Sequence, residues 1–402
     1  ILIYIIYKNI NIKFHLYTKS KIMSTNHIYD NLPKEIKSKV IKDVNGLDIH
    51  YLESGVKKDD SELIILLHGF PELSFSWRKI LPRLSDDGYH VVAPDQRGFG
   101  STIGGDLTYT NNLSDFSHIN LATDIYLFIQ KLGYKKVKCI VGHDSGVGPA
   151  SWLALIRPDF FSNLVIMSGP FTGPPNPIKI SEKIYLPDTD KMDLDLDKLS
   201  IPRKHYQSYY RTKSANKDMM ESKQGLRSFI RAYYYYKSAD WINNKPFELS
   251  SWSSEELSKM PTYYIMNKNM NMAETVNEFM PSDNEINNCK WLNENEIEVY
   301  EKEYSKTSFQ GGLNWYRAGV DYKNLQKLSL FSGRTIDIPS LFMSGINDWG
   351  TYQRPGAVKK MSSIMTKFNG VSLIENAGHW VQQENPEKVS KLILELINNS
   401  TS

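Results

Sequence analysis

The distribution of apolar residues predicts that buried strands alternate with amphipathic helices in the first part of the chain. Four short, mostly apolar runs predict buried parallel strands: Leu63–Leu67, Tyr89–Ala93, Val137–Val141 and Leu164–Met167. Between the second and third runs, apolar residues at helical spacing predict one face of a helix: Leu121, Ile125, Phe128, Ile129 and Leu132. Strands that alternate with helices indicate an α/β fold with a mostly parallel sheet and helices on both faces.

This alternation is interrupted by residues 170–334. They are rich in Tyr, Lys, Asn, Ser and Met and contain helical fragments with few strand-like runs. Beyond them, Ile338–Met343 and Val371–Ile374 predict two more strands, and a last helix is predicted to begin at Pro386 with Asn385 as its N-cap. We therefore predict one core domain, formed by residues 41–169 and 335–402, into which residues 170–334 are inserted as a helical cap domain.

The first 40 residues are interpreted as an N-terminal extension. Residues 1–22 hold four lysines and no acidic residue, and 19 of these 22 residues are Ile, Leu, Tyr, Lys, Asn or Phe. We interpret them as a translated leader that is not part of the native protein, with Met23 as the natural start; a targeting segment is the alternative. The apolar run from Ile1 to Tyr7 is far shorter than the ~20 residues of a membrane span. We expect a cytoplasmic protein that does not insert into membranes.

Composition and charge exclude one further class of function. The net charge is +3, and without the lysines of residues 1–22 the chain has 44 basic and 45 acidic residues. This balance gives no basic surface of the kind that binds nucleic acid. The oligomeric state is left open by the sequence.

The strongest chemical motif follows the strand predicted over Val137–Val141. It reads Gly142-His143-Asp144-Ser145-Gly146, a small residue on either side of a central polar triplet. A strand, such a turn and a helix form the nucleophile elbow of α/β hydrolases, in which the central side chain is exposed by a strained turn. With Asp144 at the centre, both flanking positions are glycines, so Asp144 is the predicted nucleophile.

Two other interpretations of this motif stay open. If Ser145 were the nucleophile, His143 would occupy a position that needs a small residue. Taken alone, the motif could also be an ordinary strand-to-helix turn in which an aspartate caps the helix.

Three further motifs make the elbow interpretation stronger. An apolar run leads into His68-Gly69-Phe70-Pro71-Glu72, where the backbone N–H of Phe70, together with that of Ser145, is predicted to form an oxyanion hole. Asp348 and His379 each follow a predicted strand, so the order is nucleophile, acid and histidine, as this fold uses. We predict that His379 is the general base and Asp348 the acid that orients it. Asp337 is the rival for the acid role.

These motifs resemble the epoxide hydrolases of the α/β-hydrolase fold superfamily. The resemblance rests on His68–Glu72, Gly142–Asp144 and Gly378-His379-Trp380, and it runs from about Val44 to Asn398. Residues 170–334 resemble the cap domain of that family. Their segments His205-Tyr206-Gln207 and Glu296–Tyr300, followed by Gly312–Arg317, are similar to the two segments that carry paired tyrosines. The resemblance implies that these tyrosines are Tyr206 and Tyr300, with Tyr209 and Tyr210 close to the first.

The resemblance implies a two-step reaction on a small epoxide. The Asp144 carboxylate opens the ring, the tyrosines protonate its oxygen, and water activated by His379 hydrolyses the resulting ester. Neither a metal nor an organic cofactor is required, and the expected partners are the epoxide and water. His68, Glu72 and His143 are expected to lie behind the catalytic residues, where they hold water or support the structure.

Three alternatives share parts of this pattern. A haloalkane or haloacetate dehalogenase would use the same Asp144, His379 and Asp348. Haloalkane dehalogenases hold the departing halide with a Trp N–H directly after the nucleophile, where this chain has Ser145. An esterase that uses Ser145 conflicts with the spacing of the elbow. A ligand receptor without catalytic activity would not need an intact set of catalytic residues.

Overall fold

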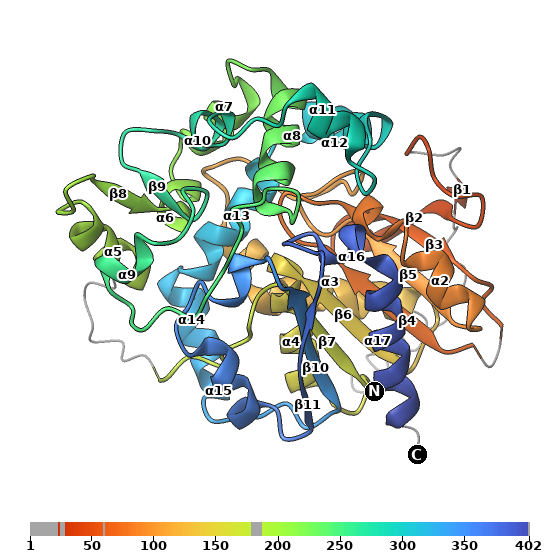
Figure 1. The fold of residues 1–402 in the computed structure, drawn as a ribbon. Helices are drawn as coiled ribbons and strands as arrows, with labels where there is room; N and C mark the ends of the chain where they lie inside the picture. Colours follow the sequence, from red (N-terminus) through yellow and green to blue (C-terminus); the bar gives the residue numbers. More distant parts are fainter. Residues whose placement is uncertain (1–22, 25–28, 59–60, 178–186, 401–402) are drawn as a thin grey trace, which may run out of the picture.

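A nine-stranded sheet forms the centre of the molecule (Figure 1). The computed structural model describes residues 23–24, 29–58, 61–177 and 187–400. The strand order is β1-β2-β3-β5-β4-β6-β7-β10-β11, and every pair from β5 to β11 is parallel. The strands are β1 (Met23–Ser24), β2 (Lys37–Val44), β3 (Leu47–Ser54), β4 (Leu63–Leu67), β5 (His90–Pro94), β6 (Cys139–His143), β7 (Leu164–Met167), β10 (Ser340–Gly345) and β11 (Phe368–Ile374). The predicted mostly parallel sheet is confirmed.

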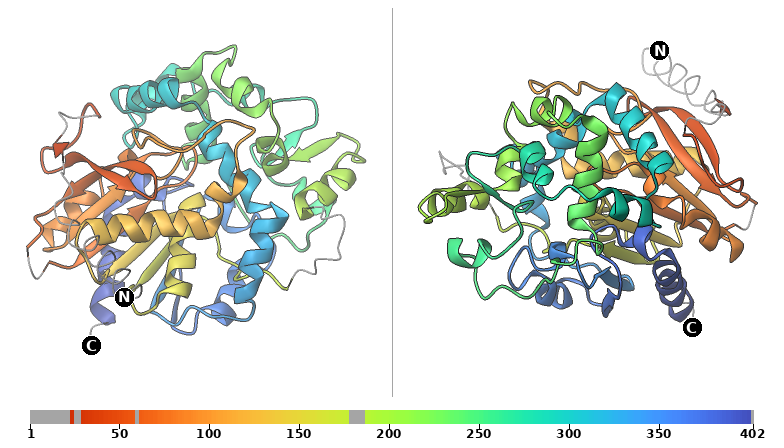
Figure 2. Two further views of the ribbon diagram at one scale, coloured as in Figure 1. Left: turned by 180° about the vertical axis from the view of Figure 1, so that it is seen from behind. Right: turned by 45° about the horizontal axis from the view of Figure 1, so that its top comes forward.

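Helices cover both faces of this sheet because alternate residues of its buried strands point to opposite sides. Ile64 and Leu66 belong to one hydrophobic cluster and Leu63 and Ile65 to another. The first cluster includes α2 (Leu81–Asp86) and α17 (Pro386–Asn399), and the second includes α3 (His118–Lys131), α4 (Val147–Ile156) and α15 (Ala357–Ile364). The pair α3 and α4 comes to the front in the reverse view of Figure 2. The predicted last helix begins at Pro386, and the side chain of Asn385 caps it.

The sheet extends further toward the N-terminus than the sequence patterns indicated. Strands β2 and β3 are antiparallel and joined at Asn45-Gly46, where both residues have positive φ, 49° and 77°. Asn-Gly is the preferred pair for such a two-residue hairpin turn. Strand β2 begins at Lys37, inside the predicted N-terminal extension, whereas the predicted leader over residues 1–22 lies outside the described residues.

The segment between β7 and β10 is mostly helical, as its composition suggested. It contains a two-stranded antiparallel sheet of β8 (Arg203–His205) and β9 (Ile265–Asn267). A capping box begins each of the helices α10 (Met272–Asn277), α11 (Asp283–Asn288) and α12 (Glu294–Thr307). In each box the side chain of the N-cap residue accepts a hydrogen bond from the backbone N–H three residues later, and the glutamate at that later position accepts one from the N-cap N–H. The helices are α5 (Asp188–Leu196), α6 (Tyr206–Tyr210), α7 (Ala215–Met220), α8 (Leu226–Lys237), α9 (Ser254–Leu257), α10 (Met272–Asn277), α11 (Asp283–Asn288), α12 (Glu294–Thr307), α13 (Gln310–Gly319) and α14 (Tyr322–Leu328).

This inserted segment, residues 170–334, packs on the sheet through buried polar contacts as well as apolar ones. Arg78 follows the 3₁₀ turn η1 (Ser74–Trp77) and is 2% exposed. Its guanidinium donates to Glu296 Oε1 of α12 at 2.7 Å, to Gln383 Oε1 at 2.7 Å and to the carbonyl oxygen of Trp291 at 3.0 Å. Gln383 belongs to α16 (Val381–Glu384), so one side chain joins three parts of the chain.

We predict that Arg78→Ala destabilises the fold strongly, because it leaves the partly buried Glu296 and the buried Gln383 without this donor. The free energy of unfolding should fall by about 3–5 kcal/mol, measured by urea denaturation. Arg83→Ala is the matched control, because the ion pair of Arg83 with Glu387 is 3.8 Å long and exposed. The control should change stability by less than about 0.5 kcal/mol. Equal losses in the two variants would contradict the assigned role of Arg78.

Candidate active site

The site is built on a strained turn at the end of β6. Asp144 follows His143 directly and has φ 50°, an unusual conformation for a residue with a Cβ atom. The 3₁₀ turn η3 (Asp144–Gly146) then leads into α4. A Cβ atom on Gly142 would lie 2.4 Å from the carbonyl oxygen of Gly146, and one on Gly146 would lie 2.5 Å from that of His68. Glycine is therefore needed on both sides, and the turn presents the Asp144 side chain with 14% of it exposed.

His379 lies between two carboxylates. Its Nδ1 is 3.0 Å from Asp348 Oδ1, and its Nε2 is 3.3 Å from Asp144 Oδ2. Asp348 also accepts from the Ser344 hydroxyl and from the backbone N–H of Gly350, at 2.9 and 2.7 Å. Burial opposes ionisation of Asp348, but the charge and hydrogen bond of His379 hold its pKa below the usual range. Since an ionised carboxylate only accepts, Nδ1 of His379 carries the proton of the hydrogen bond to Asp348.

The three residues converge because their strands are near neighbours in the sheet. Asp144 follows β6, Asp348 follows β10 and His379 follows β11, and only β7 separates β6 from β10. The carboxyl ends of parallel strands lie at one edge, so turns after them face one another. The rival acid, Asp337, is exposed and accepts from the hydroxyl groups of Thr335 and Thr366.

One of the two predicted oxyanion donors contacts the side chain of Asp144. The backbone N–H of Phe70 donates to Asp144 Oδ1 at 3.0 Å. A Cβ atom on Gly69 would lie 2.4 Å from Asp144 Cβ, so a glycine permits this approach. Ser145 is the next residue of the turn, and its buried hydroxyl has no hydrogen-bond partner among the described residues.

Glu72 and His143 form a buried ion pair behind these residues. His143 Nδ1 lies 2.5 Å from Glu72 Oε2, and His143 Nε2 donates to the carbonyl oxygen of His379 at 2.8 Å. Burial disfavours the charged form of His143, but the charge and hydrogen bond of Glu72 raise its pKa above the usual value. Glu72 also accepts from Gln382 Nε2 at 2.7 Å. His68 is uncharged by contrast: burial lowers its pKa, and its Nε2 accepts the N–H of Gln96 at 3.1 Å.

The structure does not bring together the two tyrosines that the sequence predicted as a pair. Tyr206 begins α6, and burial, followed by the charge of Asp144, raises its pKa well above the usual value. Tyr300 on α12 lies elsewhere. Its hydroxyl is 2.8 Å from Ser76 Oγ and 3.4 Å from Gln383 Oε1. Burial raises the pKa of Tyr300, and the main charges that act on it are those of Arg78 and Glu72.

Tyr316, and not Tyr300, lies beside Tyr206. Its ring centroid lies 6.2 Å from that of Tyr206 and 5.6 Å from that of Phe70. Burial and then the charge of Asp144 raise its pKa well above the usual value. It lies one helical turn after Gly312 of α13, and a Cβ atom on Gly312 would be 2.4 Å from the Phe70 ring. The hydroxyl of Tyr206 donates to Gln353 Oε1 at 3.2 Å, while the neighbouring Tyr209 donates to Asp218 and Tyr210 to Tyr233.

Comparison with protein families matches residues 62–386 to the family described as alpha/beta hydrolase fold. This chain belongs to that family.

Individual members of this α/β-hydrolase family are similar along most of the chain. Epoxide hydrolase B of Mycobacterium tuberculosis is 27% identical over 371 residues, which covers 89% of this chain and 97% of that protein. The structure of potato (Solanum tuberosum) epoxide hydrolase I has a TM-score of 0.68 at 27% identity and covers 90% of this chain and 99% of the potato chain. An epoxide hydrolase from an endophytic Streptomyces shares the fold, with a TM-score of 0.72 at 23% identity.

The electrostatics of this α/β-hydrolase site favour an ionised Asp144. Burial alone would favour the neutral acid. The hydrogen bond and charge of His379, with the charges of Lys237 and His143, nevertheless hold the pKa of Asp144 well below its usual range. Lys237 and Tyr316 were both missed by sequence reasoning. The only sequence signal for Tyr316 was its place in the segment Gly312–Arg317, and Lys237 had none.

Within the described parts of the chain, no group of three or more His, Cys, Asp or Glu residues could hold a metal ion, and no helix is long and apolar enough to cross a membrane.

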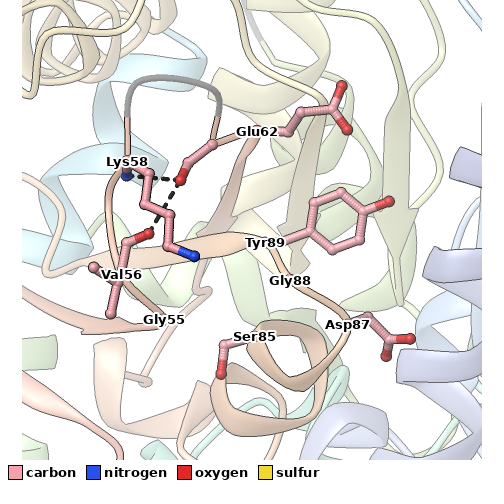
Figure 3. A pocket seen from close by; sticks show the side chains of 9 residues that line it. Gly55, Val56, Lys58, Glu62, Ser85, Asp87, Gly88 and Tyr89 are labelled. Atoms are coloured by element: carbon pink, nitrogen blue, oxygen red, sulfur yellow. Dashed lines mark hydrogen bonds between the residues drawn. The ribbon is translucent and has the colours of Figure 1, made fainter.

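A surface cavity of about 490 Å³ lies at the opposite edge of the sheet, beside the residues where β4 and β5 begin (Figure 3). None of the predicted site residues lines it. Its lining consists of Gly55, Val56, Lys58, Ser61, Glu62, Ser85, Asp87, Gly88 and Tyr89.

We predict that Gly142→Ala destabilises the turn, because the new methyl group would meet the Gly146 carbonyl oxygen at 2.4 Å. The free energy of unfolding should fall by about 1–3 kcal/mol, measured by chemical denaturation. Gly319→Ala is the control, because nothing lies within 4 Å of its added Cβ. Alanine is also the better residue at this helical position, so the control should be neutral or stabilising. A Gly142→Ala variant as stable as the control would show that the turn can relax.

Proposed function

We propose that this chain is an epoxide hydrolase, which converts an epoxide and water into a vicinal diol. One observation carries the proposal. A carboxylate, Asp144, occupies the nucleophile position of the turn, and its charge acts on two tyrosines of the inserted segment whose ring centroids lie 6.2 Å apart, the buried Tyr206 and the partly buried Tyr316. The relatives named above as epoxide hydrolases support the same class of reaction.

In the first step, Asp144 Oδ2 attacks a ring carbon of the epoxide. Oδ2 is the oxygen assigned to this attack because Oδ1 already accepts the Phe70 N–H. The new bond joins Oδ2 to carbon, the ring C–O bond breaks, and its electron pair goes to the ring oxygen. A tyrosine hydroxyl gives that oxygen a proton and becomes a phenolate. The ionised state of Asp144 makes it competent for this attack without a separate base.

In the second step, water hydrolyses the ester on Asp144. His379 Nε2 takes a proton from the water, and the oxygen bonds to the Asp144 carboxyl carbon. Asp348 holds His379 with its Nε2 toward the ester and stabilises the imidazolium. The N–H groups of Phe70 and Ser145 stabilise the oxyanion. When the ester bond breaks, the proton on His379 passes to the leaving oxygen. The other hydrogen of the water ends on the tyrosine phenolate.

The ion pair of Glu72 and His143 supports the base. His143 Nε2 donates to the carbonyl oxygen of His379 and so fixes the backbone from which the base projects. Glu72 is held in turn by Gln382 and by the N–H of Gly69, at 2.7 and 2.9 Å. We assign His68, Glu72 and His143 to positioning of the catalytic residues.

The inserted segment, residues 170–334, is the proposed cap domain of this enzyme, and residues 41–169 and 335–402 are the proposed core. The cap supplies both tyrosines, while the core supplies Asp144, Asp348 and His379. The cytoplasmic location stays a prediction from the sequence.

A haloalkane or haloacetate dehalogenase is the alternative function. It would use Asp144, His379 and Asp348 in the same way but would need donors that stabilise a departing halide. The residue after the nucleophile is Ser145, not the tryptophan that haloalkane dehalogenases use. Buried hydroxyl groups that can give up a proton suit a departing alkoxide, and a halide needs no proton.

We predict that His379→Gln separates the two steps. Ester formation needs only Asp144 and the tyrosines, so the variant should react with an epoxide once and then stop. Intact-protein mass spectrometry should show a lasting gain equal to the mass of the epoxide, and peptide mapping should place it on Asp144. The wild-type protein should return to its own mass and release the diol.

Two controls accompany this experiment. The double variant Asp144→Asn, His379→Gln should gain no mass, because the nucleophile is gone. Haloalkanes and haloacetate offered to the wild type decide the alternative: halide release without turnover of any epoxide would replace the proposed function with dehalogenation. Turnover of epoxides without a protein adduct would mean that water attacks the epoxide directly.

We predict that Tyr206→Phe and Tyr316→Phe each slow ester formation in the His379→Gln background. Loss of a general acid costs about 10²–10⁴ in rate, and the double substitution should nearly abolish the step. Rapid-quench mass spectrometry gives the rate. Tyr300→Phe is the matched control, because its hydroxyl bonds Ser76 and Gln383. A large loss in Tyr300→Phe with none in Tyr316→Phe would restore the pair expected from the sequence.

A further inference from the structure

Lys237 is a buried lysine that the proposed mechanism has not used. It is the last residue of α8 and is 3% exposed. Among the described residues, no carboxylate forms an ion pair with its ammonium group. Four aromatic rings surround Nζ instead, with centroids at 5.1 to 5.9 Å: Tyr264 at 5.1 Å, Tyr233 at 5.3 Å, Trp380 at 5.4 Å and Tyr263 at 5.9 Å.

This cage suits a cation in two ways. The negative faces of the rings attract an ammonium group, most strongly where water is excluded. The carbonyl end of α8 adds a partial negative charge at the residue where the lysine lies. A buried cation without a carboxylate partner is nevertheless costly to fold. Packing of the core therefore does not by itself require a charged side chain at position 237.

Lys237 is connected to the catalytic residues by its backbone and by its charge. Its carbonyl oxygen accepts the backbone N–H of His379 at 3.0 Å. Burial opposes ionisation of Asp144 and Asp348, and the charge of Lys237 is one of those that lower the pKa of both. The side chain of Lys237 therefore lies within electrostatic range of Asp144 and Asp348, the two carboxylates that flank His379.

The same charge acts on a connected group of tyrosines. Tyr210 donates to the Tyr233 hydroxyl at 3.0 Å, and Tyr233 faces Lys237 within the cage. Burial raises the pKa of Tyr233, while Lys237 opposes that rise. The ring of Tyr210 lies 5.5 Å from Tyr206 and 5.1 Å from Tyr316, the two proposed acids. The tyrosine group thus runs from the cage to the proposed proton donors.

The charge balance of ring opening gives this cation a role. At rest, Asp144 and Asp348 are both negative, and the charges of Glu72 and His143 balance each other. During the first step one negative charge leaves Asp144 for the ring oxygen and then, after proton transfer, for a tyrosine phenolate. A fixed cation nearby lowers the energy of that charge in a site from which water is excluded.

We propose that Lys237 is a positioning residue for ring opening, and that its caged ammonium group stabilises the charge that passes from Asp144 to the tyrosines. The proposal rests on the proposed function. It is tied to the first step, because only there does the negative charge move from Asp144 to a tyrosine. In the second step the phenolate is already formed, and His379 supplies the positive charge beside the oxyanion. Lys237 exchanges no proton and forms no bond with the substrate.

The test compares Lys237→Met with Lys237→Arg, each combined with His379→Gln. In this background only ester formation is observed, and the carbonyl oxygen of residue 237 can still hold the His379 loop. Ester formation should slow about ten- to hundredfold with methionine and recover within a few-fold with arginine. In an otherwise wild-type chain, ester hydrolysis after a single turnover should keep nearly its original rate in both variants.

Lys79→Met is the matched control. Lys79 is also partly buried, but it donates to the carbonyl oxygen of Trp291 and is not among the main charges that act on Asp144. Its replacement should leave ester formation unchanged. If Lys237→Met fails to fold, Lys237→Gln replaces it with the same expected slowing, because glutamine also removes the charge.

The possible results separate the two proposals. If the parent His379→Gln forms ester and the neutral variants form it equally fast, the role of Lys237 is overturned and the proposed function stands. Equal slowing of both steps, or no recovery with arginine, would reduce Lys237 to a packing residue. If the parent forms no ester with any epoxide, the proposed function fails, and the role of Lys237 fails with it.

Discussion

The conformation of Asp144 is the constraint on which the rest of the site depends. Its φ of 50° turns the chain sharply out of β6, so that the carboxylate leaves the sheet plane and meets His379. Glycine at positions 142 and 146 permits this conformation, because a Cβ atom at either position would clash with a backbone carbonyl oxygen. The Phe70 N–H then fixes Oδ1, which leaves Oδ2 for His379 or for a substrate. A strained residue is thus held by contacts on every side, as expected where strain serves function.

The parts of the site that follow strands could be predicted from the sequence. Asp144, Asp348 and His379 each follow the end of an apolar run within five residues, and the parallel arrangement of such runs brings their ends to one edge. The hairpin of β2 and β3 was missed although its signal was present. Asn45-Gly46 is a strong turn pair, but β2 is only partly buried and its apolar residues do not alternate cleanly.

The parts of the site that come from the inserted segment could not be predicted in the same way. Tyr300 and Tyr316 lie on neighbouring helices, α12 and α13, and both are surrounded by sequence similar to one family. Which hydroxyl turns toward Asp144 depends on how closely each helix approaches the core. Gly311 and Gly312 let α13 approach Gly98 and Phe70, whereas Tyr300 is held against Ser76 by a hydrogen bond. Packing between segments that are far apart in the chain produces no periodic pattern in the amino-acid sequence of either segment.

The end of α8 and the loop that carries His379 are joined by several hydrogen bonds and a direct backbone contact. His379 donates to the Lys237 carbonyl oxygen, and Trp380 Nε1 donates to that of Tyr234 at 2.8 Å. Glu384 accepts the N–H groups of Gly378, Trp380 and Ala239, the last of which lies just beyond α8. A Cβ atom on Gly378 would lie 2.5 Å from the Ser238 backbone, so the two segments are in direct contact.

This contact constrains how substrate can enter. If the inserted segment moved away as a rigid piece, it would remove the hydrogen bond that holds the backbone of the base and separate Lys237 from the carboxylates. Access that preserves the catalytic geometry must therefore leave the end of α8 in place. Motion is better accommodated where α6 and α13 meet, since their tyrosines pack edge to face through rings that can shift without breaking backbone hydrogen bonds. The segment that carries the proposed proton donors can then adjust to a substrate, while the proposed base and its neighbouring charge stay fixed.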